Sequence, residues 1–187
     1  MIMKQFIIYS ACFLGTLFLN SFSSNSCNYL LKAKENSIQF DTSLNDEIFL
    51  INEKSILRSV GDVYPYLNKE DESVLLFSKK GDEYLKMHHE LGGGRNSYDR
   101  FEVGYTKKEN EKKELLTKYD HFITESGISL GIDKDAFLKK TCKKKLKISY
   151  ENDFTVYQYS NTEWLYNAQY YFRSNTLVKF CFGYETP

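Results

Sequence analysis

Two similar pentapeptides, far apart in the chain, constrain its fold most. "FEVGY" occupies residues 101–105 and "FCFGY" occupies residues 180–184, 79 positions later. A second pair of matching stretches precedes the pentapeptides: "VLLFS" at 74–78 comes before the first, and "VYQYS" at 156–160 comes before the second. Chance recurrence is the alternative, because Phe and Tyr are abundant in this chain. Ordered landmarks at a period of about 80 residues favour a duplicated unit.

Each unit is predicted to begin with a capped helix. Asn52 and Asp133 are N-cap residue types, whose side-chain oxygens can accept a hydrogen bond from a free amide of the first turn. We expect helices over about 53–60 and 134–142. Their apolar residues fall at spacings that share one helical face, namely Ile56, Leu57 and Val60 in the first helix and Phe137 and Leu138 in the second.

Period-2 alternation after each helix predicts antiparallel strands. In "EWLYNAQYYFR" (163–173) one face carries Trp164, Tyr166, Ala168, Tyr170 and Phe172, and the next strand turns Val178, Phe180, Phe182 and Tyr184 to the core. The first unit does the same with Leu85, Met87, Phe101, Val103 and Tyr105. The predicted fold class is α+β: two tandem repeats, each a short helix packed on an antiparallel β-meander, forming one or two adjoining sheets.

The N-terminal residues have the layout of an export signal. Lys4 precedes an uncharged apolar run, Phe6–Leu19, and small polar residues follow. The run is too short for a comfortable transmembrane helix. We expect cleavage after residue 23 or 26, and a buried N-terminal helix is the alternative. The predicted organisation is a signal peptide (1–26, with a lipoprotein signal as one form), a first repeat (27–106), a charged linker (107–124) and a second repeat (125–187).

Export would place the cysteines in an oxidising compartment, where they can form disulfides. Cys27 lies at the cleavage zone and resembles the lipid-acceptor Cys of bacterial lipoproteins, with Cys12 a lower-ranked rival. The remaining pair, Cys142 and Cys181, is predicted to form a disulfide, since both lie in the second unit. Alternation points Cys181 away from the helix that ends at Cys142, which is a geometric objection to that bridge.

The composition and motifs argue against several function classes. Lys plus Arg and Asp plus Glu both number 25, so no basic excess attracts nucleic acid. "HHE" (88–90) suggests a metal but offers only two ligands on one side of a strand. "GGGR" (92–95) lacks the following helix of a phosphate loop and is read as a hairpin loop. We expect no catalytic residues, no metal site and no cofactor.

The strand face opposite the predicted core is the candidate partner surface. Tyr and Arg are enriched where proteins dock, because each joins apolar area to directed hydrogen bonds. An ordinary solvated sheet face is the alternative. The predicted partner-binding residues are Tyr84, Lys86, His88 and Arg100 in the first unit, and Tyr171, Arg173 and Lys179 in the second.

Two stretches resemble a known family. "GISLGIDKDAFLKK" (127–140) and "AQYYFRSNTLVKFCFGY" (168–184) resemble the opening and closing segments of the small exported modules in SmpA/OmlA lipoproteins and β-lactamase inhibitory proteins. In the inhibitory proteins two such modules occur in tandem and their sheets form a concave surface that grips a partner. The resemblance implies a similar fold here.

The predicted function is an exported, non-enzymatic protein-binding module, an inhibitor or immunity-type protein of a bacterial envelope. The alternative is an outer-membrane assembly or structural lipoprotein, and a hydrolase with an unrecognised site ranks third. The expected partner is another protein, the expected location is the periplasm or outer membrane, with secretion as an alternative, and lipid at Cys27 would supply a membrane tether.

Overall fold

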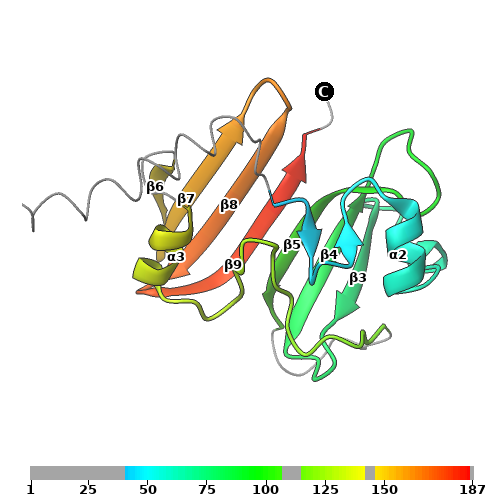
Figure 1. Cartoon of the computed structure of the whole chain (residues 1–187), viewed down its shortest axis with the longest axis horizontal. Coiled ribbons are helices and arrows are strands. Elements are labelled where there is room, and N and C mark those ends of the chain that lie inside the picture. The colour runs from blue at the N-terminus through cyan, green and yellow to red at the C-terminus, as the bar shows by residue number, and fades with distance from the viewer. Residues whose placement is uncertain (1–40, 107–114, 142–145, 186–187) are drawn as a thin grey trace, which may run out of the picture. The chain divides into compact units, whose positions relative to one another are not determined.

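A seven-stranded antiparallel sheet dominates the protein (Figure 1). The computed structural model describes residues 41–106, 115–141 and 146–185, which belong to one compact unit, Phe40–Pro187. The sheet order is β3-β4-β5-β9-β8-β7-β6. The strands are β3 (Ser73–Phe77), β4 (Glu83–His89), β5 (Tyr98–Tyr105), β6 (Lys147–Glu151), β7 (Phe154–Asn161), β8 (Tyr166–Arg173) and β9 (Thr176–Tyr184).

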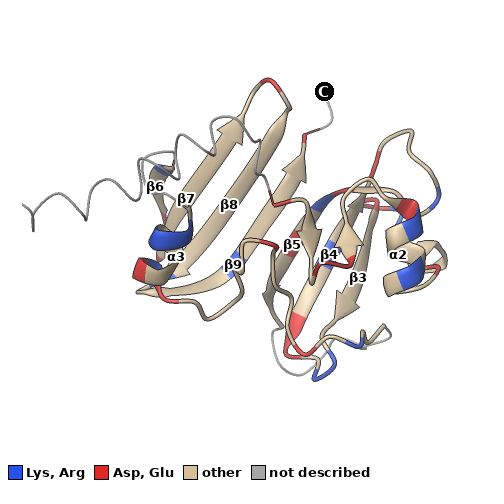
Figure 2. Ribbon diagram, in the orientation of Figure 1, with Lys and Arg blue, Asp and Glu red and all other residues tan. Residues whose placement is uncertain are grey.

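Short elements accompany this sheet. They are helices α2 (Glu53–Ser59) and α3 (Lys134–Thr141), a 3-10 turn η1 (Tyr64–Tyr66), and a two-stranded sheet of β1 (Ser43–Leu44) and β2 (Ile48–Phe49). The predicted α+β class with antiparallel strands is therefore confirmed. Charges of both signs are interspersed along the ribbon, as Figure 2 shows, in keeping with a formal net charge of zero.

The two pentapeptides lie side by side at the centre of the sheet. β5 carries the first and β9 the second, and these strands pair antiparallel with Phe101 opposite Phe182 and Val103 opposite Phe180. The Phe101 and Phe182 rings meet edge to face, with centroids 5.7 Å apart. Strands from both predicted units thus form one continuous sheet, the first of the two alternatives left open by the sequence.

Both predicted N-caps are present. The Asn52 side-chain oxygen accepts a hydrogen bond from the Ser55 amide at 3.0 Å, and α2 follows. The Asp133 carboxylate accepts one from the Asp135 amide at 2.8 Å at the start of α3. These bonds satisfy amides of the first turn that have no partner within the helix, which is why each helix begins where the sequence predicts.

The core lies between one face of the sheet and a covering layer. In Figure 1 α2, α3 and the β1–β2 hairpin lie on the same side of the sheet. Phe137 of α3 packs over β7 and β8, with its ring centroid 4.7 Å from that of Tyr170 and 5.1 Å from that of Phe172. Ile56 of α2 is fully buried. We call the sheet surface away from these helices the open face.

Four apolar side chains predicted in the core lie elsewhere. Leu57 is exposed, because α2 buries Ile56 and turns Leu57 outward. Trp164 is exposed in the turn before β8, which begins only at Tyr166, and Tyr105 is exposed at the end of β5. A bulge opposite Tyr171 and Phe172 shifts the register of β9 by one residue, so Leu177 and not Val178 is buried there.

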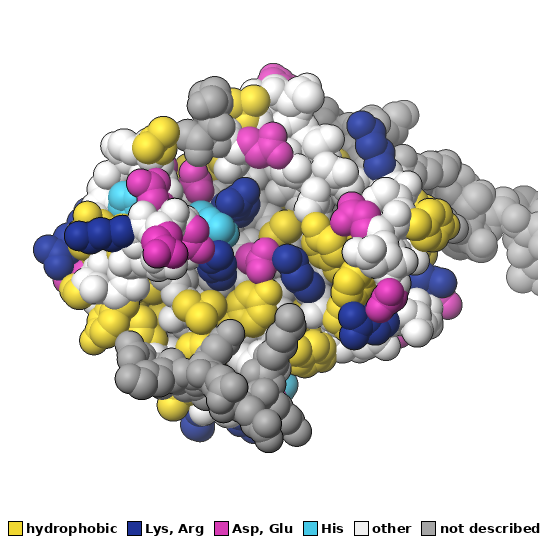
Figure 3. All heavy atoms as spheres, turned by 180° about the vertical axis from the view of Figure 1, so that it is seen from behind, with side chains coloured by type: hydrophobic (Ala, Val, Ile, Leu, Met, Phe, Trp, Pro, Cys, Tyr) yellow, Lys and Arg dark blue, Asp and Glu magenta, His cyan; other side chains and the backbone are white. Residues whose placement is uncertain are grey.

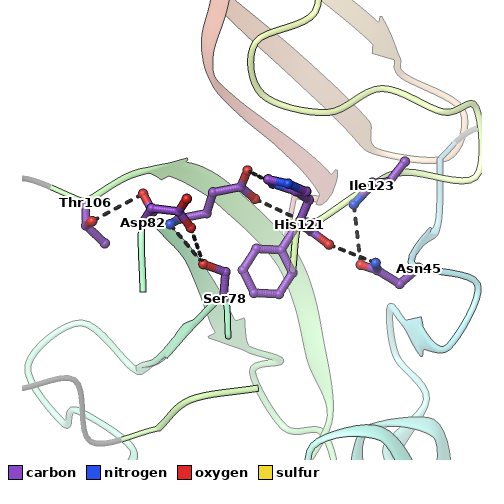
Figure 4. Close-up of polar contacts among 8 residues, drawn as sticks. Asn45, Ser78, Asp82, Thr106, His121 and Ile123 are labelled. Carbon is purple, nitrogen blue, oxygen red and sulfur yellow. Dashed lines mark hydrogen bonds and ion pairs between the residues drawn. The ribbon is translucent and has the colours of Figure 1, made fainter. Parts of the chain in front are cut away.

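Part of the predicted exposed linker packs against the fold. Phe122 is fully buried, its amide donates to the buried Glu83 carboxylate at 2.9 Å, and His121 Nδ1 lies 2.8 Å from the same carboxylate. Figure 4 shows this cluster, in which Asn45 also donates to the His121 carbonyl at 2.9 Å. The run of charges predicted an exposed linker, but the aromatic residues Tyr119 and Phe122 within it are buried. Residues 107–114 lie outside the described residues.

Candidate functional site

A broad hollow crosses the open face. Its volume is about 1000 Å³, and every strand of the seven-stranded sheet contributes to its lining. Seven strands spaced about 4.8 Å apart span roughly 30 Å, which is wide for a small ligand and suits a protein surface. Figure 3 views this face and shows apolar side chains gathered in a band across it, with charged groups of both signs among them. Tyr66 and Leu75 are lining residues with exposed apolar area.

The seven predicted partner-binding residues all lie on the open face. In the register of the sheet, Lys86 pairs with Glu102, His88 with Arg100, and Tyr171 with Lys179. The hollow brings together five of the seven, and His88 and Arg100 lie on the same face beyond it. The five are Tyr84, Lys86, Tyr171, Arg173 and Lys179.

A polar network joins the two halves of the sheet at the floor of the hollow. The Tyr84 hydroxyl donates to one oxygen of Glu102 at 2.7 Å, and the Lys179 ammonium lies 2.9 Å from the other. The same ammonium sits over the Tyr171 ring, 5.1 Å from its centroid. Glu102 therefore connects β4, β5, β9 and β8 through two contacts and a cation–π interaction.

The electrostatics of Glu102 favour its ionised form. Burial by itself raises the pKa of a carboxyl group, but the hydrogen bonds from Lys179 and Tyr84 outweigh it and hold the pKa of Glu102 below its usual 4.5. The carboxylate is thus charged at neutral pH and holds both donors in place. The floor of the hollow is preorganised before any partner arrives.

A second ion pair lies at the β3 end of the hollow. The Lys86 ammonium lies 2.6 Å from Asp71, which also accepts from the Ser73 hydroxyl at 2.8 Å. These two hydrogen bonds lower the pKa of Asp71. The sequence missed Asp71, because its polar surroundings resembled an ordinary turn; its spacing two residues before a strand was the only signal.

Aromatic side chains and an arginine form the other end. The Arg173 guanidinium sits 4.8 Å from the centroid of the Phe154 ring, and that ring meets Tyr171 edge to face at 6.2 Å. Arg173 also lies 3.8 Å from Asp153, but both side chains are largely exposed, so this ion pair contributes little. Phe154 was not among the predicted site residues, since its strand was recognised only by its match to 74–78.

Gly104 makes room for one tyrosine of the network. A Cβ atom built on Gly104 would lie 2.6 Å from the Tyr84 ring, closer than real side chains approach. The Tyr84 ring therefore lies across the strand at the position where Gly104 has no side chain. This explains the glycine of "FEVGY" by the packing of the open face.

His88 and Cys181 are both partly shielded on the open face. Burial lowers the pKa of His88 to about 4, helped by the charges of Arg100 and Lys86, so the imidazole is neutral at pH 7. Burial raises the pKa of the Cys181 thiol to about 11, and this thiol points to the Gln169 side-chain oxygen at 3.8 Å.

The predicted Cys142–Cys181 bridge is not formed in this structure. Cys181 is a free thiol, and Cys142 lies outside the described residues. The physical reason is the one that alternation raised: Cys181 lies on the open face, while α3 covers the other face. A bridge would require Cys142 to reach around the sheet. Cys27 and the predicted signal peptide also lie outside the described residues.

The "HHE" and "GGGR" stretches form the end of β4 and the loop that follows it. His89 packs edge to face on Tyr98, and its Nε2 lies 3.1 Å from the Gly94 carbonyl oxygen. Glu90 accepts from the Ser97 hydroxyl, so residues 90–97 form a hairpin loop between β4 and β5. Among the described residues no group of three or more His, Cys, Asp or Glu side chains is arranged to hold a metal ion.

Within the described part of the chain, the helices are too short to cross a membrane. Comparison of the sequence with protein-family models and with curated proteins, and of the chain with solved structures, found no match.

Proposed function

We propose that this protein is a non-enzymatic binding module that holds or inhibits another protein through the open face of its sheet. The hollow across that face carries the proposal, because its lining joins exposed apolar area to fixed hydrogen-bonding groups. The concrete form that the sequence favours is an exported immunity-type protein of a bacterial envelope, with lipid at Cys27 as its membrane tether.

The residue content of the hollow supports a protein partner. Tyrosine and arginine dominate binding hot spots, and here Tyr171 and Arg173 are neighbours on β8, two residues apart on one face. Most of the charges are already paired within the chain, as in Lys86–Asp71 and Lys179–Glu102. A partner therefore meets a nearly neutral, ordered surface and need not neutralise buried charges.

We also propose that the two halves of the sheet derive from one duplicated unit. Each half has a side-chain-capped helix followed by an antiparallel meander whose last strand ends in Gly-Tyr. The last strands of the two halves are antiparallel neighbours, as an approximate two-fold axis between them requires. Such an arrangement resembles the tandem modules that grip a partner with adjoining sheets.

Site-specific photo-crosslinking in the native cell tests the proposed surface. A benzophenone amino acid replaces Leu75, which lines the hollow, or Leu57, which is similarly exposed but lies on α2, away from the hollow. We expect an adduct of one defined mass from position 75 and none of that mass from position 57. Mass spectrometry of the adduct identifies the partner. Identical adducts from both positions, or none from position 75, would refute docking on the open face.

A further inference from the structure

The two edges of the seven-stranded sheet differ in their protection. At the β3 edge, Ser73 and Asn68 exchange backbone hydrogen bonds, and Phe77 bonds to the 115–117 segment through its amide and its carbonyl, each at 2.8 Å. At the other edge, β6 pairs with β7 alone among the described residues. An uncovered edge presents a row of backbone groups that can pair with another strand.

The register of the β6–β7 hairpin tells which backbone groups of β6 point outward. Glu151 and Phe154 flank the two-residue turn 152–153, so they form the hydrogen-bonded pair that closes it. Hydrogen-bonded pairs alternate along an antiparallel ladder. The amides and carbonyls of Lys147, Ser149 and Glu151 therefore point to β7, and those of Ile148 and Tyr150 point away from the sheet.

Large side chains lie on this uncovered strand. Tyr150 is 80% exposed and Ile148 is 46% exposed. Their strand partners Thr155 and Tyr157 alternate with Val156, which faces the same way as Tyr171, so Ile148 and Tyr150 lie on the helix side of the sheet. An edge that bears exposed apolar side chains and free backbone groups favours association with another strand.

The sequence of β6 is complementary to itself. It reads Lys-Ile-Ser-Tyr-Glu, so antiparallel pairing about Ser149 places each Lys147 opposite Glu151 of a second copy, and each Ile148 opposite Tyr150. Opposite charges and apolar pairs directly across from each other stabilise an antiparallel ladder. The same register aligns the outward backbone groups of Ile148 with those of Tyr150, which pair with no other strand in the described part of the chain.

We propose that β6 is a homodimerisation edge, at which two copies pair antiparallel about Ser149. The two-fold axis passes between the two copies of Ser149, and each copy offers the same surface to the other, as in most homodimers. The two sheets become one continuous sheet of fourteen strands. Five paired residues bury less area than a standard stable interface. We therefore expect a weak dimer that exchanges with the monomer over the accessible concentration range.

Sedimentation velocity of the purified chain over a range of concentrations measures this association. We expect a shift from monomer to dimer as the concentration rises. Ile148→Pro removes an outward amide without removing a bond to β7, so it should abolish the dimer and leave the thermal melt nearly unchanged. A chain that stays monomeric up to about 1 mM, or a dimer that survives Ile148→Pro, would overturn the proposal.

Charge exchange supplies a control that is independent of folding. Lys147→Glu places Glu opposite Glu in the dimer, and Glu151→Lys places Lys opposite Lys, so each variant alone should self-associate about tenfold more weakly. An equimolar mixture restores both opposite-charge pairs and should dimerise like the wild type. Misfolded variants cannot rescue each other in this way. Two variants that associate as the wild type does, with no gain on mixing, would also overturn the proposal.

Discussion

Gly183 fixes the distance between the two central strands. A Cβ atom on this residue would overlap the Asp99 carbonyl oxygen and lie 2.5 Å from the Arg100 Cα, both of them backbone atoms of β5. Its φ of +153° adds to the strain of any larger side chain there. The glycines of the two pentapeptides therefore serve different purposes, since Gly104 makes room for the Tyr84 ring and Gly183 for the backbone of the next strand.

Replacing Gly183 by Ala is expected to destabilise the fold by about 2–3 kcal/mol, because a strand must move to admit the methyl group. Gly104→Ala should cost less, since the Tyr84 ring can swing away and only its hydrogen bond to Glu102 is lost. Urea denaturation of both variants measures the two free energies. The account of Gly183 fails if its variant is as stable as the wild type.

His88 gives the protein a specific response to acid. Its folded pKa of about 4 lies below the unfolded value of 6.5, because burial disfavours the charged ring. Arg100 and Lys86 lower the pKa further, and Glu102 and Asp71 oppose them. Between these two pKa values the unfolded chain binds a proton that the folded chain does not. The contribution of His88 to the free energy of unfolding is therefore fully present above pH 6.5, and it is lost as the pH falls towards 4.

His88→Gln removes this titration and should flatten the acid side of the stability curve. The loss of unfolding free energy between pH 7 and pH 4 should be smaller in the variant, by up to about 3 kcal/mol. Carboxylates other than its neighbours Asp71 and Glu102 titrate alike in both proteins, so the difference between the two curves reports on His88 and this local cluster. Parallel curves from urea denaturation at each pH would contradict the buried, neutral imidazole.

At the scale of the element, α2 separates two neighbouring apolar residues that the sequence grouped together. Ile56→Ala is expected to cost about 2–5 kcal/mol, because it leaves a cavity beneath the helix, whereas Leu57→Ala should stay within about 0.5 kcal/mol. Chemical denaturation of the two variants is the measurement. Similar losses for both would mean that α2 buries a wider face than the structure shows.

Most elements could be predicted from local signals. Asn52 and Asp133 located both helix starts, and period-2 alternation assigned the faces of β4, β5 and β8, so all seven predicted partner residues lie on the open face. Alternation failed where the register slips, at the bulge that buries Leu177 in place of Val178. It failed again at Trp164, since a turn and a strand end look alike in an aromatic-rich stretch.

The pairing of strands that are far apart in sequence could not be predicted from such local signals. No local pattern showed that β5 would meet β9, although the two pentapeptides pair with each other there. Asp71 and Phe154 come to the hollow from opposite edges of the sheet, and only that central pairing brings them to one surface. The aromatic anchors Tyr119 and Phe122 were hidden in a charged stretch for a similar reason, because their partners lie far away in sequence.

At the scale of the whole molecule, the continuous sheet is what forms the proposed binding surface. The Tyr84–Glu102–Lys179 network crosses the β5–β9 junction, so the floor of the hollow exists only when both halves share one sheet. The helices cover the other face, where the main buried cluster lies, whereas Phe77 is buried and lines the hollow. Exposed lining residues such as Tyr66 and Leu75 lie outside that cluster, so we expect that they can change without unfolding the protein.

The affinity for the crosslinked partner, measured by titration calorimetry, tests the central claim most directly. Tyr171→Ala is expected to weaken binding by about 2 kcal/mol or more, roughly thirtyfold, because the ring lies in the hollow between Lys179 and Phe154. Trp164→Ala, which removes an exposed aromatic outside the hollow, should leave the dissociation constant unchanged. Equal affinities for the wild type and Tyr171→Ala, or a loss only with Trp164→Ala, would contradict a binding site on the open face.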